Sequence, residues 1–506
     1  MQGIHVFDRQ AKTVIDLESF VKQDHFPRKI DRALDTAFVR ELTAACYADG
    51  LGRPSIDPEV YFRMERVAYL YGITSERQLC EDIYYNFAYR WFCRLSLDDE
   101  VPDHSSLTKI RDRLGEEVFE SVFRQIVALC RKKGLVLDEC RVMTDATLIA
   151  ADAATVSMML NEPAQAQPEQ PPSPDGPTER PAQPKVSNDT HHSRTDPDAT
   201  LARKDRTPLQ LKYKVHQTID AGSRVILDTH VTTGAVHDSQ PYLEQLQRIH
   251  QRYGIHIREA TADRGYGSAA IIRDLQQQGI DTYIPLWSGR SGSSKYLNGE
   301  LVYEKEHDRF RCPQGKYLMP NRAISENHKR YASSSADCRA CPQESECPAR
   351  SRKSAPHLHF VLRNLDQDLF EDVQAKMRDP TFRQKRTERM WKSEGLFAEA
   401  KQNHCLSRAK YRGRSKVQIQ AYFSAMVQNL KRLVSVIYLW VITRWLCRPS
   451  QAACNPALPQ NTQTFSTGPI RFLGLRRIQR IVAVSAEINL TAFFPWLSAF
   501  RGVYVV

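Results

Sequence analysis

The sequence predicts an α/β protein with an all-helical N-terminal domain, a mixed-sheet core and a cysteine-rich insertion. Apolar residues recur at helical spacing through residues 1–138, whereas alternating β-forming residues and turns begin at residue 139. Four of the twelve cysteines gather between Cys312 and Cys347, so this segment is expected to have its own architecture. At 506 residues, the chain is long enough for several domains with buried cores.

The N-terminal domain is predicted from helix start and stop signals. Ser55 can cap a helix (Asp57, with Pro58 just inside, is the alternative cap), and Gly72 can end it. Residues 74–79 then start a second helix. Two helices joined by a tight glycine turn are typical of a helix-turn-helix that binds DNA, and a plain helical bundle is the alternative.

The charge balance indicates a polyanionic partner. Lys and Arg number 71 and Asp and Glu number 59, which gives a net charge of +12. Such a protein is expected to bind nucleic acid, although an ordinary basic enzyme fits the same charge. No signal peptide is predicted, and the apolar stretch 433–446 is too short for a membrane span and carries Arg444. The scattered cysteines fit a reducing cytoplasm.

The core is predicted, in order, as three strands, a helix, a strand, a helix and a strand. These elements cover residues 139–144, 213–219, 225–231, 238–254, 255–262, 268–278 and 282–286. The first three strands can form an antiparallel meander, while strands joined through helices should be parallel. This is the order of the ribonuclease H-like fold, in which helices cover both faces of a mixed sheet and one more helix follows.

Two interruptions are expected within this core. Residues 161–205 are rich in Pro, Gln, Ser and Asp, which favours a disordered excursion from the first part of the core, 139–286. The cysteine-rich insertion, 287–380, delays the last core helices to 381–447. The tail, 448–506, carries no motif that indicates a role. Because residues 470–506 mix basic and apolar residues without clear periodicity, we expect the tail to be read-through into neighbouring DNA and therefore dispensable.

The insertion contains a candidate metal site. Cys338 and Cys341 are spaced to place two thiolates on one side of a tetrahedral ion, and Cys312 and Cys347 would complete a four-thiolate set. The other spacings are looser than in common zinc ribbons. A structural Zn²⁺ and a set of free thiols or disulfides therefore remain alternative interpretations.

Three acidic residues are the candidate catalytic groups. Asp263 follows a predicted strand and precedes a glycine-rich turn, Asp145 lies at the sheet centre, and Glu394 lies on the last core helix. Their carboxylates suit a pair of Mg²⁺ ions, which prefer hard oxygen ligands and support phosphoryl transfer. Singly, each has an ordinary explanation, because strand-end Asp residues often cap turns and helical Glu residues are usually solvated.

Basic residues near these carboxylates are candidates for binding phosphate. Lys401 is seven residues after Glu394 and therefore on the same helix face. Arg264 directly follows Asp263. A further basic run comprises Arg408, Lys410, Arg412, Arg414 and Lys416, and its first three members are predicted to bind DNA together with Lys401 and Arg264.

The chain resembles bacterial insertion-sequence DDE transposases of the broad IS-five and IS-eleven-eighty-two group. The matching motifs are Met143-Thr-Asp145-Ala-Thr, Ser193-Arg-Thr-Asp-Pro-Asp-Ala199, Tyr213-Lys-Val-His216, Val236-His-Asp-Ser239, Thr261-Ala-Asp263-Arg-Gly-Tyr, Glu394-x6-Lys401, Tyr411-Arg-Gly and Asn429-Leu-Lys-Arg432. The helical block that follows Gly52 and the insertion cysteines are also similar to the group's pattern. The group often has an Arg four residues before the Glu, where this chain has Met390 beside Arg389.

The resemblance implies a transposase in which Asp145, Asp263 and Glu394 bind two Mg²⁺ or Mn²⁺ ions. It implies binding to the terminal inverted repeats of an insertion sequence, strand hydrolysis that frees a 3′-OH, and attack of that hydroxyl on target DNA. Because a transposase acts on two DNA ends at once, the resemblance also implies a homodimer or higher oligomer. It further implies that the protein is located in the bacterial cytoplasm, at the nucleoid. The alternatives are a related nuclease that does not join strands and a decayed, non-catalytic DNA-binding protein.

Overall fold

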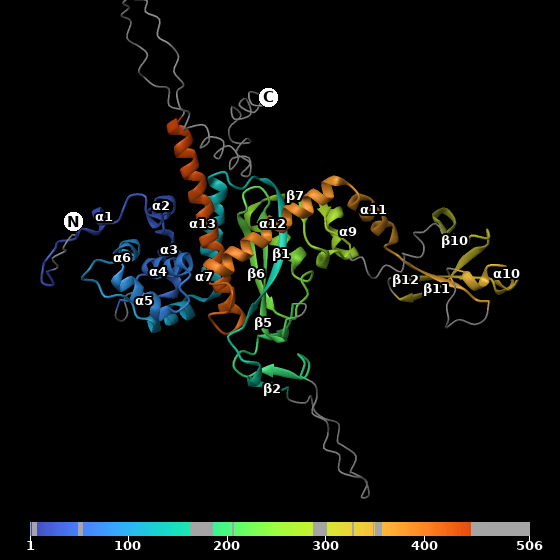
Figure 1. Ribbon diagram of the computed structural model, residues 1–506, viewed down its shortest axis with the longest axis horizontal. Coiled ribbons are helices and arrows are strands. Elements are labelled where there is room, and N and C mark those ends of the chain that lie inside the picture. Colours follow the sequence, from blue (N-terminus) through green and yellow to red (C-terminus); the bar gives the residue numbers. More distant parts are fainter. Residues whose placement is uncertain are drawn as a thin grey trace, which may run out of the picture. The chain divides into compact units, whose positions relative to one another are not determined.

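The computed structural model describes residue 2 and residues 8–48, 54–161, 186–204, 207–286, 301–325, 328–347, 349 and 357–446. The chain divides into two compact units. The first comprises Met1–Val236, Glu244–Ile257 and Lys392–Val506, and the second comprises His237–Leu243 and Arg258–Trp391. The elements drawn in Figure 1 confirm a mixed α/β protein with an N-terminal helical region. In the described part of the chain, no helix is long and apolar enough to cross a membrane.

The N-terminal region forms the helices that its start and stop signals predict. They are α1 (Leu17–Phe20), α2 (Phe26–Ala33), α3 (Phe38–Thr43), α4 (Pro58–Tyr71), α5 (Glu76–Tyr85), α6 (Phe87–Phe92) and α7 (His104–Lys132). The Asp57 carboxylate accepts a hydrogen bond from the Glu59 N–H at 2.9 Å and so caps α4. Gly72 ends α4 with φ = 72°, a conformation that strains other residues.

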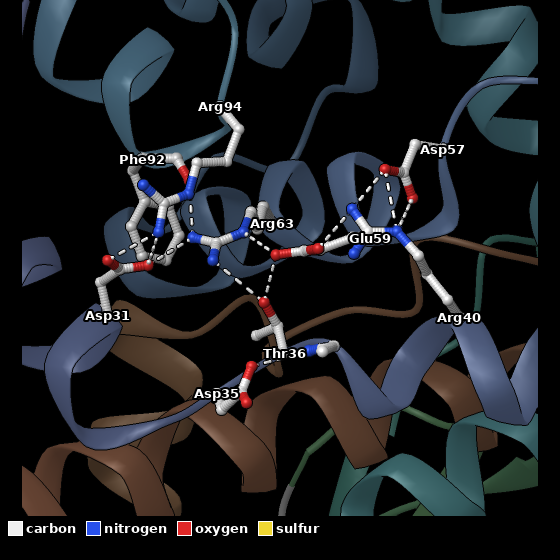
Figure 2. Close-up of polar contacts among 10 residues, drawn as sticks. Asp31, Asp35, Thr36, Arg40, Asp57, Glu59, Arg63, Phe92 and Arg94 are labelled. Carbon is white, nitrogen blue, oxygen red and sulfur yellow. Dashed lines mark hydrogen bonds and ion pairs between the residues drawn. The ribbon is translucent and has the colours of Figure 1, made fainter.

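A buried arginine ties these helices together. Arg63 on α4 is 3% exposed, and its guanidinium donates to Glu59, Asp31, the Phe92 carbonyl and Thr36 at distances of 2.7 to 3.0 Å. Figure 2 shows how this guanidinium lies between acceptors from different parts of the region. Because every acceptor compensates part of the desolvation cost, the buried charge is tolerated.

The sheet of the first unit is antiparallel. Its strands are β1 (Glu139–Ala150), β4 (Thr200–Ala202), β5 (Gln210–Asp220) and β6 (Ile226–Thr233), and β5 pairs with each of the other three. The predicted hairpin is therefore confirmed as β5 and β6. The register places Asp145 of β1 opposite Gln217 of β5, and Gln217 opposite Thr229 of β6.

The excursion predicted at 161–205 is ordered over its second half, which corrects the compositional prediction. Residues 162–185 lie outside the described residues, but β3 (His191–Ser193) pairs with β2 (Met158–Leu160), and β4 joins the main sheet. Asp196 is fully buried and accepts hydrogen bonds from the Tyr213 hydroxyl at 2.6 Å and the Gly413 N–H at 3.0 Å. Within residues 186–204, polar side chains such as Asp196 therefore make internal hydrogen bonds.

Helix α13 (Arg414–Leu446) covers part of this sheet. It packs against α7 and β6. The Gln418 amide accepts from the Val231 N–H at 2.6 Å and donates to the Thr229 carbonyl at 3.0 Å. Asn429 bonds the N–H and the carbonyl of Ile226 in the same way, at 2.8 and 2.9 Å. Open strand edges expose unpaired backbone groups, and these two amides satisfy part of the β6 edge.

The second unit contains a short parallel pair and a separate antiparallel sheet. Strands β7 (His256–Thr261) and β8 (Asp281–Tyr283) are parallel and joined through α9 (Ala269–Gln277), as predicted. The antiparallel sheet has the order β13-β12-β11-β10-β9. Its strands are β9 (Val302–Glu304), β10 (Arg309–Arg311), β11 (Tyr317–Ser325), β12 (His328–Ser333) and β13 (Phe360–Asn364), with the short helix α10 (Ser335–Arg339) between β12 and β13.

Three helices complete the described structure. Helix α8 (Tyr242–Tyr253) precedes β7, α11 (Gln367–Met377) follows β13, and α12 (Pro380–Asn403) carries the predicted Glu394. Helix α12 contributes residues to both units. The tail, 448–506, lies outside the described residues, so its predicted dispensability stays a prediction.

Candidate active site

Asp145 occupies the middle of β1, half-buried, on the face that helix α12 covers. Side chains alternate along a strand, so Asp145, Thr147 and Ile149 share one face. Ile149 packs in one core cluster with Phe397 and Ala400 of α12. The Asp145 carboxylate accepts a hydrogen bond from the Ala146 N–H at 2.9 Å.

Two lysine side chains hold helix α12 beside β1. The Lys401 ammonium donates to the Thr147 hydroxyl at 2.7 Å and to the Leu148 carbonyl at 3.0 Å. The buried Lys392 ammonium donates to the Ala221 carbonyl, and the Ala221 N–H donates to the Arg141 carbonyl at 2.7 Å. This segment of α12 therefore runs beside β1 from near Arg141 to Thr147, a stretch that includes Asp145.

Glu394 lies between these two lysines with its side chain exposed. On the same helix, Phe397 is buried and Ala398 is exposed. Glu394, Ala398 and Lys401 form a stripe along one helix face. The first unit therefore brings the segments that carry Asp145 and Glu394 side by side.

Asp263 lies in the second unit, two residues after β7. Its carboxylate accepts from the Gly265 N–H at 2.7 Å and caps a 3₁₀ turn, η3 (Arg264–Tyr266). At Gly267, a Cβ would lie 2.4 Å from the Pro285 carbonyl oxygen, so only glycine fits this close approach. Asp263 thus has the capping role that a strand-end Asp commonly has. Its meeting with Asp145 and Glu394 stays a prediction.

No metal cluster is preformed at these carboxylates. Within the described ranges, no three His, Cys, Asp or Glu side chains lie close enough together to hold an ion. The donor set nevertheless fits Mg²⁺ or Mn²⁺ chemically, because carboxylate oxygens are the ligands that these ions prefer.

The predicted DNA-binding residues have different surroundings. Arg408 and Arg412 are exposed, and both lie near the Asp152 carboxylate, at 3.2 and 3.3 Å. Arg264 is exposed. The Lys401 ammonium is part-buried, and burial lowers its pKa, as do Lys204 and Lys212. Lys401 therefore belongs to an electropositive region beside β1 rather than to an open surface.

Lys410 corrects the predicted DNA-binding set. Its ammonium is buried and has no hydrogen-bond partner among the described residues, 4.9 Å from the Tyr69 ring centroid. Burial alone would lower the pKa of Lys410, but Tyr411 and Glu65 outweigh burial and raise it. Because its ammonium is buried, Lys410 is not placed to contact a phosphate backbone.

The four clustered cysteines line one cavity of about 230 Å³ in the second unit. Cys312 begins a tight turn in which its N–H donates to the Lys316 carbonyl at 2.8 Å and Gly315 adopts φ = 74°. The Cys341 N–H donates to the Cys338 carbonyl at 3.2 Å, which closes a second turn. Burial raises the pKa of Cys338 and of Cys347, and the neighbouring thiols raise both further.

His359 also lines this cavity, and the sequence reasoning missed it. It is 5% exposed, and neither ring nitrogen has a hydrogen-bond partner among the described residues. The Glu344 carboxylate lies 3.5 Å from Nε2 of His359, beyond a good hydrogen bond. A histidine 12 residues after Cys347 was visible in the sequence, but only the pairing of β12 with β13 brings it near the cysteines.

Comparisons with known proteins agree on one class. The transposase domain DUF772 matches residues 15–113, and a transposase DDE domain matches residues 311–434. The second match includes Glu394 and all four clustered cysteines. No curated protein matches the chain.

Three solved structures resemble parts of the chain. A piggyBac transposase synaptic complex with hairpin DNA has 10% identity over 84% of this chain and 83% of its own, with a TM-score of 0.32. A pre-cleavage Mos1 transpososome has 12% identity over 50% and 64%, and a Mos1 mariner paired end complex with Mn has 14% over 53% and 70%, each with a TM-score of 0.15. Scores this low do not establish a shared fold.

Proposed function

We propose that this chain, which is a DDE transposase of the insertion-sequence type, cuts and joins DNA at a site formed by Asp145, Asp263 and Glu394. The observation that carries the proposal is the course of α12, which runs beside β1 and so brings Glu394 near the face that carries Asp145. We further propose that the core has the ribonuclease H-like arrangement and that β7 delivers Asp263 to the same place.

The three carboxylates would hold two Mg²⁺ or Mn²⁺ ions. When bound, such a pair activates an attacking oxygen and stabilises the leaving oxygen of an in-line phosphoryl transfer. The chain's own residues would bind and orient the DNA. Lys401 donates to β1, which keeps Glu394 in register with the strand, and its positive charge favours a nearby phosphate. Arg264, Arg408 and Arg412 would contact the DNA backbone, and Lys410 is removed from this set.

The substrates would be the terminal inverted repeats of the element and a target DNA. Hydrolysis at the repeat boundary frees a 3′-OH, and that oxygen then attacks a target phosphate and displaces a 3′ oxygen. No side-chain nucleophile is needed, so no protein–DNA covalent intermediate forms. The N-terminal helices would bind the repeats, and an oligomer, at least a dimer, would hold two ends.

A cleavage assay on DNA with the gene's flanking inverted repeats tests this proposal. With Mg²⁺ we expect cleavage at the repeat boundary, and with EDTA none. Asp145→Asn and Glu394→Gln should each reduce the rate by at least about 10²-fold, because each removes a charged ligand that acts on the developing charge. Asp274→Asn on α9 is the matched control and should cleave normally. Specific binding without cleavage by the native chain would favour a decayed DNA-binding protein, and cleavage without strand joining would favour a nuclease.

We also propose that Cys312, Cys338, Cys341 and Cys347 hold one structural Zn²⁺. The support is the shared cavity and the two turns that present three of these thiols. In the described residues no three of these side chains lie within reach of one ion, so the thiols would have to move closer together when zinc binds. His359, a buried imidazole without a hydrogen bond, is an alternative ligand if one thiol stays outside the coordination sphere.

Elemental analysis of the purified chain tests the zinc proposal. We expect about one Zn²⁺ per chain, lost in Cys341→Ser and retained in the control Cys80→Ser, whose cysteine lies on α5. Retention of zinc in Cys312→Ser together with its loss in His359→Ala would assign the fourth position to the histidine. Absence of zinc, or disulfides found by mass spectrometry under reducing purification, would contradict the proposal.

A further inference from the structure

The polar row Asp145–Gln217–Thr229 crosses three adjacent strands of the first unit. Asp145 of β1 is directly opposite Gln217 of β5, and Gln217 is directly opposite Thr229 of β6. Directly opposite residues of antiparallel strands share a face, with Cβ atoms about 4.5–5.5 Å apart. The three side chains therefore stand side by side on the face that carries the proposed metal ligand.

The two fully buried members of this row, Gln217 and Thr229, have unmet hydrogen-bonding capacity. Gln217 and Thr229 are each 2% exposed. Among the described residues, no group partners either amide atom of Gln217 or the hydroxyl of Thr229. Buried polar groups are nearly always hydrogen-bonded, so such a pair in a sheet core calls for an explanation. Burial also leaves solvent little access to them.

The three side chains of the row could satisfy one another's hydrogen-bonding groups. A Thr hydroxyl can donate to the carbonyl oxygen of a Gln amide, and the amide nitrogen can donate to a carboxylate. The last torsion of Gln has broad preferences, so rotation about it can redirect the amide oxygen and nitrogen on an unchanged backbone. The adjacent register pair shows that such contacts are within reach, since the Thr144 and Thr218 hydroxyls lie 2.9 Å apart.

We infer that Gln217 is a positioning residue for Asp145, held in turn by Thr229. The Thr229 hydroxyl donates to Oε1 of Gln217, and Nε2 of Gln217 donates to one oxygen of Asp145, which fixes the orientation in which that carboxylate meets a divalent cation. Partners that orient a metal ligand typically change metal affinity or activity by about 10–100-fold. This inference rests on the proposed function, because it requires Asp145 to be a metal ligand.

The test measures ion affinity and activity separately. Mn²⁺ binding to the full chain is titrated by electron paramagnetic resonance, and cleavage is measured as a function of Mg²⁺ concentration. Gln217→Leu, similar in volume, should weaken Mn²⁺ binding and raise the Mg²⁺ requirement by about 10–100-fold without lowering the melting temperature. Thr229→Val should have a smaller effect, and the double variant should be no worse than Gln217→Leu alone, since both act through one chain of bonds.

The matched control is Thr218→Val, which removes a buried hydroxyl from the same strand on the opposite face. It should leave Mn²⁺ affinity unchanged, whatever it does to stability. If Asp145→Asn weakens Mn²⁺ binding but Gln217→Leu and Thr229→Val both bind as the native chain does, the positioning role is wrong. If Asp145→Asn itself binds and cleaves normally, the proposed active site fails instead. Thr229→Val keeps the test valid should Gln217→Leu not fold.

Discussion

At the residue scale, neighbouring basic residues of one run have opposite environments. Arg408 is exposed beside Asp152, whereas the Lys410 ammonium is buried near Glu65 and Tyr69. Charge run and spacing could not separate them, because the burial of Lys410 depends on α4, more than 300 positions earlier in the chain. The same limit applies to His359 and Gln217, whose neighbours are set by strand register.

A salt titration of DNA binding distinguishes the two residues. Each phosphate contact contributes about −0.9 to the slope of log K against log salt concentration for duplex DNA. Arg408→Ala should therefore weaken binding and reduce the slope by about 1. Lys410→Met, matched in size, should leave the slope unchanged. A reduced slope for Lys410→Met and none for Arg408→Ala would contradict the assignment.

At the element scale, the sequence predicts helix boundaries and hairpins that depend on interactions between nearby residues. The Asp57 and Gly72 boundaries of α4 and the hairpin of β5 and β6 were predictable, because caps and turns depend on adjacent residues. The ordering of residues 186–204 was not. Asp196 accepts hydrogen bonds from Tyr213 and Gly413. The composition of a segment gives no information about such bonds to residues elsewhere in the chain, so the order of residues 186–204 could not be predicted from it.

The packing of the N-terminal helices around Arg63 makes an element-scale prediction. Removing the guanidinium leaves Glu59 and Asp31 with only the more exposed Arg40 and Arg94 as counter-charges and leaves a cavity among the helices. Arg63→Ala should therefore destabilise the chain by about 3–5 kcal/mol, the usual cost of breaking a buried ion pair from one side. Denaturant unfolding measures this loss. Arg77→Ala, at an exposed position on α5, is the control. Equal losses of unfolding free energy for the two variants would show that the bonds of Arg63 add no stability beyond that of an exposed arginine.

At the scale of the whole molecule, the sequence was sufficient to predict the class of protein, and the two family matches confirm a DNA transposase. The three acidic residues come from β1, from the turn after β7 and from α12. Asp145 and Glu394 belong to one unit and Asp263 to the other. The central claim is that all three surround the same ions, which spacing in a sequence cannot establish.

Iron-directed cleavage of the protein tests this claim most directly. Fe²⁺ substituted for Mg²⁺ generates radicals with ascorbate and peroxide that cut the backbone only near the bound ion. We predict cuts close to residues 145, 263 and 394 in the native chain, suppressed by excess Mg²⁺ and lost from all three places in Asp263→Asn. Cuts confined to residues near 145 and 394, and unchanged in Asp263→Asn, would show that Asp263 is not part of the site.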